Sequence, residues 1–511
     1  MARQSAGDAS STLIAAFLSA VVALSFMSAQ HQLIHWFIVP IILCGAIIGT
    51  DLVEWLRGRL GLFDPNGLIG LLGYHFFFLA PILMVSWNYR MMYLPDQPED
   101  YRAWLGGMAM MNCAGLLTYR WVRKKVALRI LRSQARKLHT YHVWKIEPKR
   151  FWVFLSLSTL VSCVTQAWIF VSFGGIRGYM NTYTDWLSGQ DLFHGSALVF
   201  AIAESSPILL VIGVAVWARG KQKTWITLSI LVCLLAMLEF IVGGLRGSRS
   251  NVIWSLFWIA GIVHLYVRRF PRILALAALC VLYGFVSLYA AYKQNGSILF
   301  DKLAISGDYS AVSDTAESPA TVLVGDFSRC DVQAYLFYKI FTQQLPSYAL
   351  GQSYLGALTM IVPNVLWQDR PSTIVKWTTN AEYGTGAYES GSLQSSRVYG
   401  IAGEAMLNFG PAGLLFAYAV LGTAVAAVRV FMRKLQSDDS RLFILPFIIN
   451  FLFLLLLNDS DNGVFYLIKY GLMPVSLIIL SSSHLKLQGR SYGNSQRSST
   501  RYYGLSGSRA L

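Results

Sequence analysis

Four ionisable side chains interrupt stretches of sequence that are otherwise apolar enough to lie in a membrane: Glu204, Glu239, Glu404 and Lys469. A charge in hydrocarbon costs at least about 2.5–3.5 kcal/mol on insertion scales, so such residues mark functional sites or buried ion pairs. All four fall in the outer half of their stretches. We therefore expect one hydrated cavity that opens outward, with a pair between a glutamate and Lys469. An ion pair with a purely structural role is the alternative.

Two arginines form a second exception, because they lie in a predicted external turn over residues 243–250. This turn contains Arg246 and Arg249 among glycines and serines. The glycines permit a tight turn, and Ser250 can cap the next helix, but neither explains the arginines. A planar guanidinium suits bidentate contact with phosphate, and several together can hold a diphosphate.

The longest break in the apolar pattern is the segment 295–400. Its apolar stretches 334–341 and 354–367 are too short or too interrupted to span a membrane, so we expect short helices on the outer interface that cap a cavity. It also carries charged residues on the side where basic residues are disfavoured. These are Arg329, Asp331, Lys339, Asp369, Arg370, Lys376, Glu382, Glu389 and Arg397. They indicate binding of an anion, or a solvated loop surface.

The elements that must position these residues are membrane helices. Of the 511 residues, 55% are hydrophobic and only 13% are charged, and the mean hydropathy is +0.48. One soluble core cannot hide so much apolar surface, so lipid must cover the rest. We predict an all-α polytopic membrane protein with about twelve transmembrane helices and a large external loop. The predicted spans are 11–29, 34–50, 67–88, 103–120, 151–173, 195–218, 224–243, 251–267, 273–292, 401–428, 442–458 and 463–481.

Alternate loops are rich in Lys and Arg, which places both termini in the cytoplasm. Residues 1–294 then form nine spans with a basic cytoplasmic loop at 121–150, 295–400 the external loop, 401–481 three further spans and 482–511 a disordered cytoplasmic tail. The basic loop either sets topology or forms an interfacial amphipathic helix. Residues 27–29 resemble a cleavage site, but an uncleaved first span is favoured. The net charge of +16 lies mostly on cytoplasmic flanks, where anionic lipids and not nucleic acid are the expected partners.

Motifs for metals and nucleotides are missing from the sequence. It contains no CxxC, HExxH or Walker-type GxxxxGK[ST] pattern, so we predict no metal and no cofactor. The six cysteines give no disulfide framework, because five lie in predicted spans.

Several motifs carry a resemblance to a known family. Residues 351–355 (Gly-Gln-Ser-Tyr-Leu) and 361–371 (Ile-Val-Pro-Asn-Val-Leu-Trp-Gln-Asp-Arg-Pro) resemble the G-S-Y-L … I-P … L-W-P-x-[KR]-P segment of the bacterial Wzy-type O-antigen polymerases. Residues 403–410 (Gly-Glu-Ala-Met-Leu-Asn-Phe-Gly) are similar to that family's G-E-x-Y-L-N-F-G motif. Weaker matches are residues 329–331 to an R-x-D element and 244–247 to a G-x-R-G turn.

The resemblance implies an inverting, metal-independent glycosyltransferase of the GT-C type in the bacterial inner membrane. At its periplasmic face, such an enzyme polymerises repeat units linked to undecaprenyl diphosphate into O-antigen, capsule or exopolysaccharide. Arginines would stabilise the charge that develops on the leaving diphosphate, and a carboxylate would act as base. The candidates are Arg246, Arg249, Arg329, Arg370 and Arg397 for substrate binding, and Glu404 and Asp331 for catalysis.

Two other functions stay open. An O-antigen ligase uses the same donor, but a histidine in its large outer loop would be expected. The segment 295–400 contains none, and His194 is the nearest candidate on the outer side. A lipid-linked oligosaccharide flippase or a transporter also needs many spans, although no internal repeat is visible. Expected partners are lipid-linked oligosaccharides, membrane lipids, a chain-length regulator and a flippase.

Overall fold

The protein is built almost entirely from long helices. The computed structural model describes residues 2–488 except 90–93, 136–139, 188–196, 220–223, 302–317, 319, 363–366, 392–394 and 396. Among these residues, ten helices are long and apolar enough to cross a membrane. Six are single helices: α1 (Ala2–Ala29), α2 (Ile38–Leu56), α6 (Pro148–Ser172), α12 (Arg272–Asn295), α18 (Gly400–Lys434) and α20 (Ser460–Ser481). The chain is therefore a helical polytopic membrane protein, as the sequence predicts.

The other four candidate spans are composite, since each joins two or three helical pieces. They are α3–η2–α4 (Pro65–Tyr74, His75–Leu79, Ala80–Ser86), α8–α9 (Ala197–Ala203, Ser206–Ala218), α10–η3 (Trp225–Glu239, Phe240–Gly244) and α11–η4 (Arg249–Ile262, Val263–Val267). Three of these contain a π-helical turn, η2, η3 or η4. Such turns are frequent at functional sites, and η3 leads directly into the turn that carries Arg246.

The remaining two predicted spans are also helical, but they are not among these ten helices. Helix α5 (Tyr101–Ala135) has 35 residues, which is about 52 Å at 1.5 Å per residue. It includes residues 121–135 of the predicted basic loop 121–150, so this part continues a long helix and is neither a loop nor a separate interfacial helix. Its Arg123 binds Asp51 of α2 through two N–H···O contacts of 2.7 and 3.0 Å. Helix α19 (Leu445–Leu457) has 13 residues, or about 20 Å, less than the roughly 30 Å of hydrocarbon.

Large apolar side chains face outward along several spans. On α6, α10 and α12, the side chains of Val171, Ile226 and Ile273 are 78%, 74% and 71% exposed. Exposed apolar surface on this scale needs a cover in water. Lipid supplies that cover.

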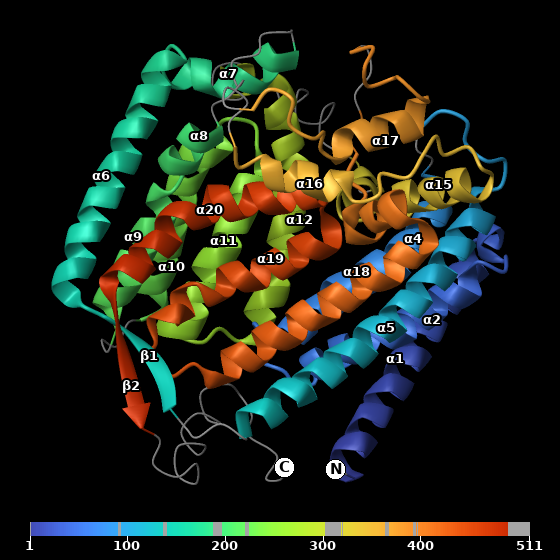
Figure 1. Ribbon diagram of the computed structural model, residues 1–511, viewed down its shortest axis with the longest axis horizontal. Coiled ribbons are helices and arrows are strands. Elements are labelled where there is room, and N and C mark those ends of the chain that lie inside the picture. Colours follow the sequence, from blue (N-terminus) through green and yellow to red (C-terminus); the bar gives the residue numbers. More distant parts are fainter. Residues whose placement is uncertain are drawn as a thin grey trace.

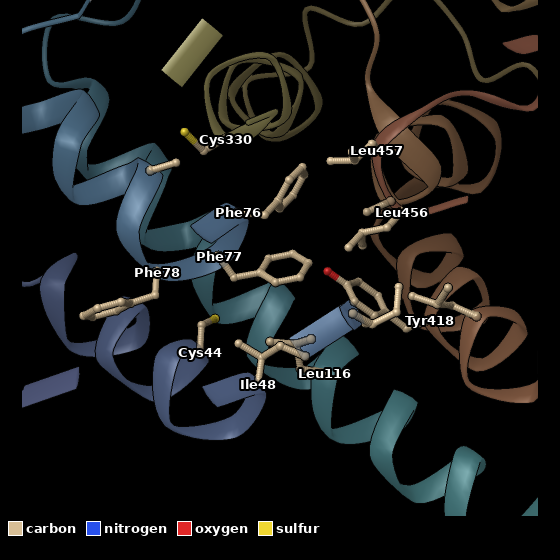
Figure 2. Packing of buried hydrophobic residues seen from close by; sticks show 14 of the residues in the cluster. Cys44, Ile48, Phe76, Phe77, Phe78, Leu116, Cys330, Tyr418, Leu456 and Leu457 are labelled. Carbon is tan, nitrogen blue, oxygen red and sulfur yellow. The ribbon is translucent and has the colours of Figure 1, made fainter. Parts of the chain in front are cut away.

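One hydrophobic core joins the N-terminal helices to α18. The π-helical turn η2 directs Phe76, Phe77 and Phe78 into it (Figure 2). Phe77 contacts Tyr418 of α18, with ring centroids 6.0 Å apart. Phe78 lies so close to α2 that a Cβ at Gly45 would come within 2.7 Å of its ring, so this close packing requires glycine.

A two-stranded antiparallel ribbon lies at the end of the molecule where α1 begins (Figure 1). Strand β1 (Thr140–Ile146) pairs with β2 (Ser482–Gln488) from Thr140↔Gln488 to Ile146↔Ser482. The prediction of a disordered tail from residue 482 is therefore wrong for its first seven residues. Val143 of β1 is buried opposite Leu485. The paired strands are more than 300 residues apart, so no local sequence pattern predicts the pairing. Residues 489–511 lie outside the described part.

The opposite end carries the segment 295–400 as short helices (Figure 1). These are α13 (Ser297–Asp301), η6 (Thr321–Asp326), α15 (Cys330–Phe341), α16 (Gln352–Thr359) and α17 (Ile374–Tyr383), with α7 (Ile176–Leu187) beside them; η1 (His31–Leu33) and η7 (Ser440–Phe443) are single 3₁₀ turns. Short helices were predicted, but not the depth of α15, which packs against α4, α5 and α18 and is buried along most of its length. Its Gln333 gains a partner there, because its Nε2 donates to the Tyr399 carbonyl at 2.8 Å.

Candidate functional site

A pocket of about 350 Å³, lined by polar and aromatic side chains, opens at the end of the molecule that carries the short helices. Its walls come from α7, the turn between η3 and α11, the end of α19 and the start of α20. The described residues that line it are Tyr183, Arg246, Gly247, Ser248, Ser250, Asn251, Trp254, Leu454, Asn458, Asn462, Phe465, Tyr466, Lys469 and Tyr470. We call it the Arg246–Lys469 pocket after its two cations.

Glu204 of the α8–α9 span lies behind these two cations and binds both. Arg246 Nη2 lies 2.9 Å from Glu204 Oε1, and Lys469 Nζ lies 2.7 Å from Glu204 Oε2. The side chains of Glu204 and Lys469 are each only 3% exposed. The predicted pair between a glutamate and Lys469 is confirmed. The structure adds Arg246, which also packs on the ring of Phe200, with Cζ 4.0 Å from its centroid.

Asn251 connects the charged residues to one another. Its Nδ2 donates to Glu204 Oε2 at 3.2 Å and to the Gly243 carbonyl at 2.9 Å, and its Oδ1 accepts from Lys469 Nζ at 2.6 Å and from the Tyr470 hydroxyl at 2.7 Å. Every polar atom of this buried amide is thus used, which fixes the orientation of Lys469. Glu239 is also buried. Its Oε1 lies so close to Gly243 that a Cβ at that glycine would be 3.0 Å away.

The turn that carries Arg246 depends on glycine. Gly247 has φ of +90°, and a Cβ there would lie 2.7 Å from the Cβ of Tyr183, so glycine satisfies both the backbone and the space. Ser250 was expected to cap the next helix, but α11 begins at Arg249 and Ser248 takes the N-cap position without a side-chain cap bond. Ser250 instead lies in the first turn, with its Oγ 3.1 Å from that of Ser248, and both line the pocket.

Glu404 lies apart from this pocket, at the junction of α16, α18 and α20. Its Oε1 accepts from the hydroxyls of Ser353 at 2.7 Å and Ser460 at 2.6 Å, and its Oε2 accepts from Ser460 N at 2.6 Å. Asn408 also donates to Ser353 Oγ at 2.8 Å. The carboxylate therefore caps the first residue of α20 and joins α16 to two spans. The structure does not bring it together with Lys469, Glu204 or Arg246.

Asp331 and Arg329 belong to the packing of the segment 295–400 against the spans. Arg329 donates through Nε to the Leu457 carbonyl at 3.1 Å and through Nη1 to the Asp326 carbonyl at 3.0 Å and the Ser328 carbonyl at 2.6 Å. Burial lowers the pKa of Arg329 and raises the pKa of Asp331. Asp331 is 2% exposed and borders a small cavity of about 30 Å³ beside Tyr335, away from the Arg246–Lys469 pocket.

A chain of buried acids continues from this region. Asp459 accepts from Tyr399 N at 3.0 and 3.3 Å, and the Tyr399 hydroxyl donates to Glu382 Oε1 at 2.7 Å. Burial raises the pKa of Asp459 well above its ordinary value, and Glu404 and Asp461 raise it further. Burial likewise raises the pKa of Glu382.

The other three predicted arginines lie in separate places. Arg249 Nη2 is 2.6 Å from Asp326 Oδ1, which ties the start of α11 to η6. Arg370 Nη1 donates to the Val362 carbonyl at 3.3 Å. Arg397 donates its backbone N–H to Ser395 Oγ at 3.2 Å and lies near Asp331, whose pKa it lowers against the effect of burial. His194 and residues 363–366 of the resemblance motif lie outside the described residues.

Of the predicted site residues, only Arg246 lines the Arg246–Lys469 pocket. Sequence reasoning marked Lys469 and Glu204 as exceptions in their spans but did not assign them to the site. It missed Asn251, Asn458 and the aromatic wall. A buried asparagine at the start of a span is a polar exception like a charge, and this signal could have found Asn251.

The helices and the pocket together define a polytopic membrane protein with a polar, cation-lined cavity at one end of its spans. Comparison of the chain with protein families, with curated proteins and with solved structures found no match. The function is therefore argued from the site itself.

Proposed function

We propose that the protein is a glycosyltransferase that polymerises lipid-linked oligosaccharides at the periplasmic face of the bacterial inner membrane. It moves a growing glycan from one undecaprenyl diphosphate carrier to a single lipid-linked repeat unit, and undecaprenyl diphosphate leaves. The observation that carries this proposal is the Arg246–Lys469 pocket, which combines two cations with amide, hydroxyl and aromatic side chains. Cations suit the diphosphate, and the neutral polar and aromatic groups suit sugars.

The position of the pocket supports the same activity. A lipid diphosphate keeps its prenyl chain in the bilayer and its phosphates at the membrane surface, and the pocket lies at the end of the spans. The other end carries many of the basic residues, among them Arg441, which donates to the His142 carbonyl of β1, and Arg219, which donates to the Ser437 carbonyl. This favours a cytoplasmic location for that end. The pocket then faces the periplasm.

The chemistry that these residues supply is electrostatic. Breaking the glycosyl–diphosphate bond develops negative charge on phosphate oxygens, and Arg246 and Lys469 stabilise that charge in a site that protein partly shields from water. We assign no base to this pocket. Glu204 is the nearest carboxylate, but both of its oxygens hold cations.

Deleting the gene tests the proposal against its two alternatives. Loss of a polymerase leaves surface glycan with single repeats and no ladder of lengths. Loss of a ligase leaves no surface glycan and accumulates lipid-linked polymer, whereas loss of a flippase removes both polymer and single repeats from the surface. A normal ladder in the deletion strain, without a second polymerase, contradicts the proposal.

A carrier of lipid-linked glycans is the second candidate. The observation that favours it is the Glu204–Lys469 pair between two spans, together with the buried Glu239 in a third span, since ionisable residues in spans often mark transport pathways. The same deletion strain distinguishes it, because single repeats then fail to reach the surface.

A further inference from the structure

Arg246 and Lys469 both contact a third residue, Glu204, which does not line the pocket. Each oxygen of the Glu204 carboxylate contacts one cation, at 2.9 and 2.7 Å. Two cations this close would repel each other without the carboxylate between them, and Lys469 would be costly in its span. Glu204 therefore sets where both cations meet the pocket.

The pocket wall itself carries no acid. None of the fourteen described residues that line it is Asp or Glu. Of the three N–H groups of the Lys469 ammonium, two are directed to Glu204 and Asn251. The ammonium also lies 5.3 Å from the ring centroid of Tyr470 and 5.6 Å from that of Phe465, and no oxygen or nitrogen of another described residue accepts the third N–H. A pocket with two cations, no lining carboxylate and a remaining N–H donor selects an anionic ligand.

We propose that Arg246 and Lys469 form a two-cation site for a prenyl diphosphate, and that Glu204 is the positioning residue that holds both side chains at the pocket wall. This inference deepens the proposed function and rests on it for the glycan part of the ligand. The sugars contact neutral lining residues such as Asn458, Asn462 and Trp254. Lys469 is thus a ligand-binding residue as well as one half of an ion pair.

The competing explanation is that the Glu204–Lys469 ion pair only stabilises the packing of α8–α9 on α20. Charge-balanced variants distinguish this structural role from a ligand-binding role. Lys469→Met leaves Glu204 without one of its cations, so it can fail for structural reasons alone. The double variant Glu204→Gln/Lys469→Met removes both charges, leaves neither buried unpaired, and keeps the amide within reach of Arg246. A purely structural pair predicts that this double variant recovers what the single variant loses.

The measurement is binding of geranylgeranyl diphosphate to the purified full-length protein in detergent, with the uncharged alcohol geranylgeraniol as reference. We expect the double variant to bind the diphosphate about tenfold to hundredfold more weakly, the effect of one lost charge-assisted hydrogen bond, and to bind the alcohol as the native protein does. Lys376→Met is the matched control, because it removes a lysine paired with Glu389 at 2.8 Å outside the pocket. It should bind as the native protein does.

Native diphosphate affinity in the double variant overturns the proposal. If the lysine variants do not fold, Asn458→Asp replaces them, because it adds a negative charge to the pocket wall without removing a buried charge. This variant should lose diphosphate affinity but not alcohol affinity, and unchanged diphosphate affinity contradicts the site. If diphosphate binds as expected but no repeat units are joined, the site stands and the polymerase proposal falls.

Discussion

Replacing Glu404 by Gln separates a catalytic base from a structural cap. The carboxylate accepts three hydrogen bonds, two on Oε1 and one from Ser460 N on Oε2. A glutamine keeps one acceptor oxygen. Its amide nitrogen takes the place of the other oxygen and faces a donor group, so the hydrogen bond at that position is lost. Losing one charge-assisted bond costs about 1.5–3 kcal/mol, and the two that remain weaken, so we expect a loss of roughly 2–4 kcal/mol.

This loss converts into a measurable shift in melting temperature. A chain of 511 residues has an unfolding entropy of about 1 kcal/mol/K if it unfolds as one unit, so the Tm of Glu404→Gln should fall by roughly 2–4 °C. Ser460→Ala is the graded control, because it removes one hydroxyl donor and keeps the backbone N–H; it should lower Tm by about 1–2 °C.

The assay combines thermal unfolding in detergent with polymer formed per unit of folded protein. We expect Glu404→Gln to lose stability but to keep its activity per folded molecule within about twofold. A variant with native Tm whose turnover falls a hundredfold or more would refute the structural reading and return Glu404 to the role of catalytic base.

Three further predictions concern the packing and the topology. Because the pKa of Asp459 is raised in the folded protein, the folded state binds protons more tightly than the unfolded state, so stability should fall as pH rises above about 4 toward that raised pKa. Asp459→Asn should therefore show a smaller drop in Tm between about pH 5 and pH 8 than the native protein, and an equal drop contradicts this assignment. Arg329→Ala should cost roughly 2–5 kcal/mol of stability, because four carbonyls lose a cationic donor; native Tm with lost diphosphate binding would instead indicate a ligand contact. Reporters fused after Glu389 should be active outside the cytoplasm and those after Gln134 and Asn494 inside, and a cytoplasmic signal at Glu389 would contradict the topology.

The helical membrane architecture follows from sequence because the bilayer imposes one simple rule. A span needs about 20 apolar residues in a row, and such runs are visible without any tertiary information. The rule fails where protein and not lipid surrounds the helix. In α5 the polar Asn112 accepts a hydrogen bond from the Tyr418 hydroxyl at 2.8 Å, so this helix does not need the hydropathy of a lipid-exposed span at that position. The 13 residues of α19 pack against α18 and α20, so this helix does not need the length of one.

The candidate site could be predicted only in part from the sequence, for a related reason. An ionisable residue inside a span indicates an oppositely charged partner, which is why a pair between a glutamate and Lys469 could be predicted. Its identity could not, because Glu204, Glu239 and Glu404 give the same signal in sequence. The sequence also does not distinguish an arginine that lines a pocket, such as Arg246, from one that binds backbone carbonyls, such as Arg329.

Joining of repeat units by the purified protein is the most direct test of the central claim. The protein in detergent is mixed with undecaprenyl-diphosphate-linked repeat units from its own host, and the lipid-linked products are separated by size. We expect a ladder of two and more repeats with release of undecaprenyl diphosphate, and no ladder with Arg246→Ala. A folded protein that binds the substrate but yields only single repeats, or a ladder of native intensity from Arg246→Ala, would contradict the proposed polymerase and its pocket.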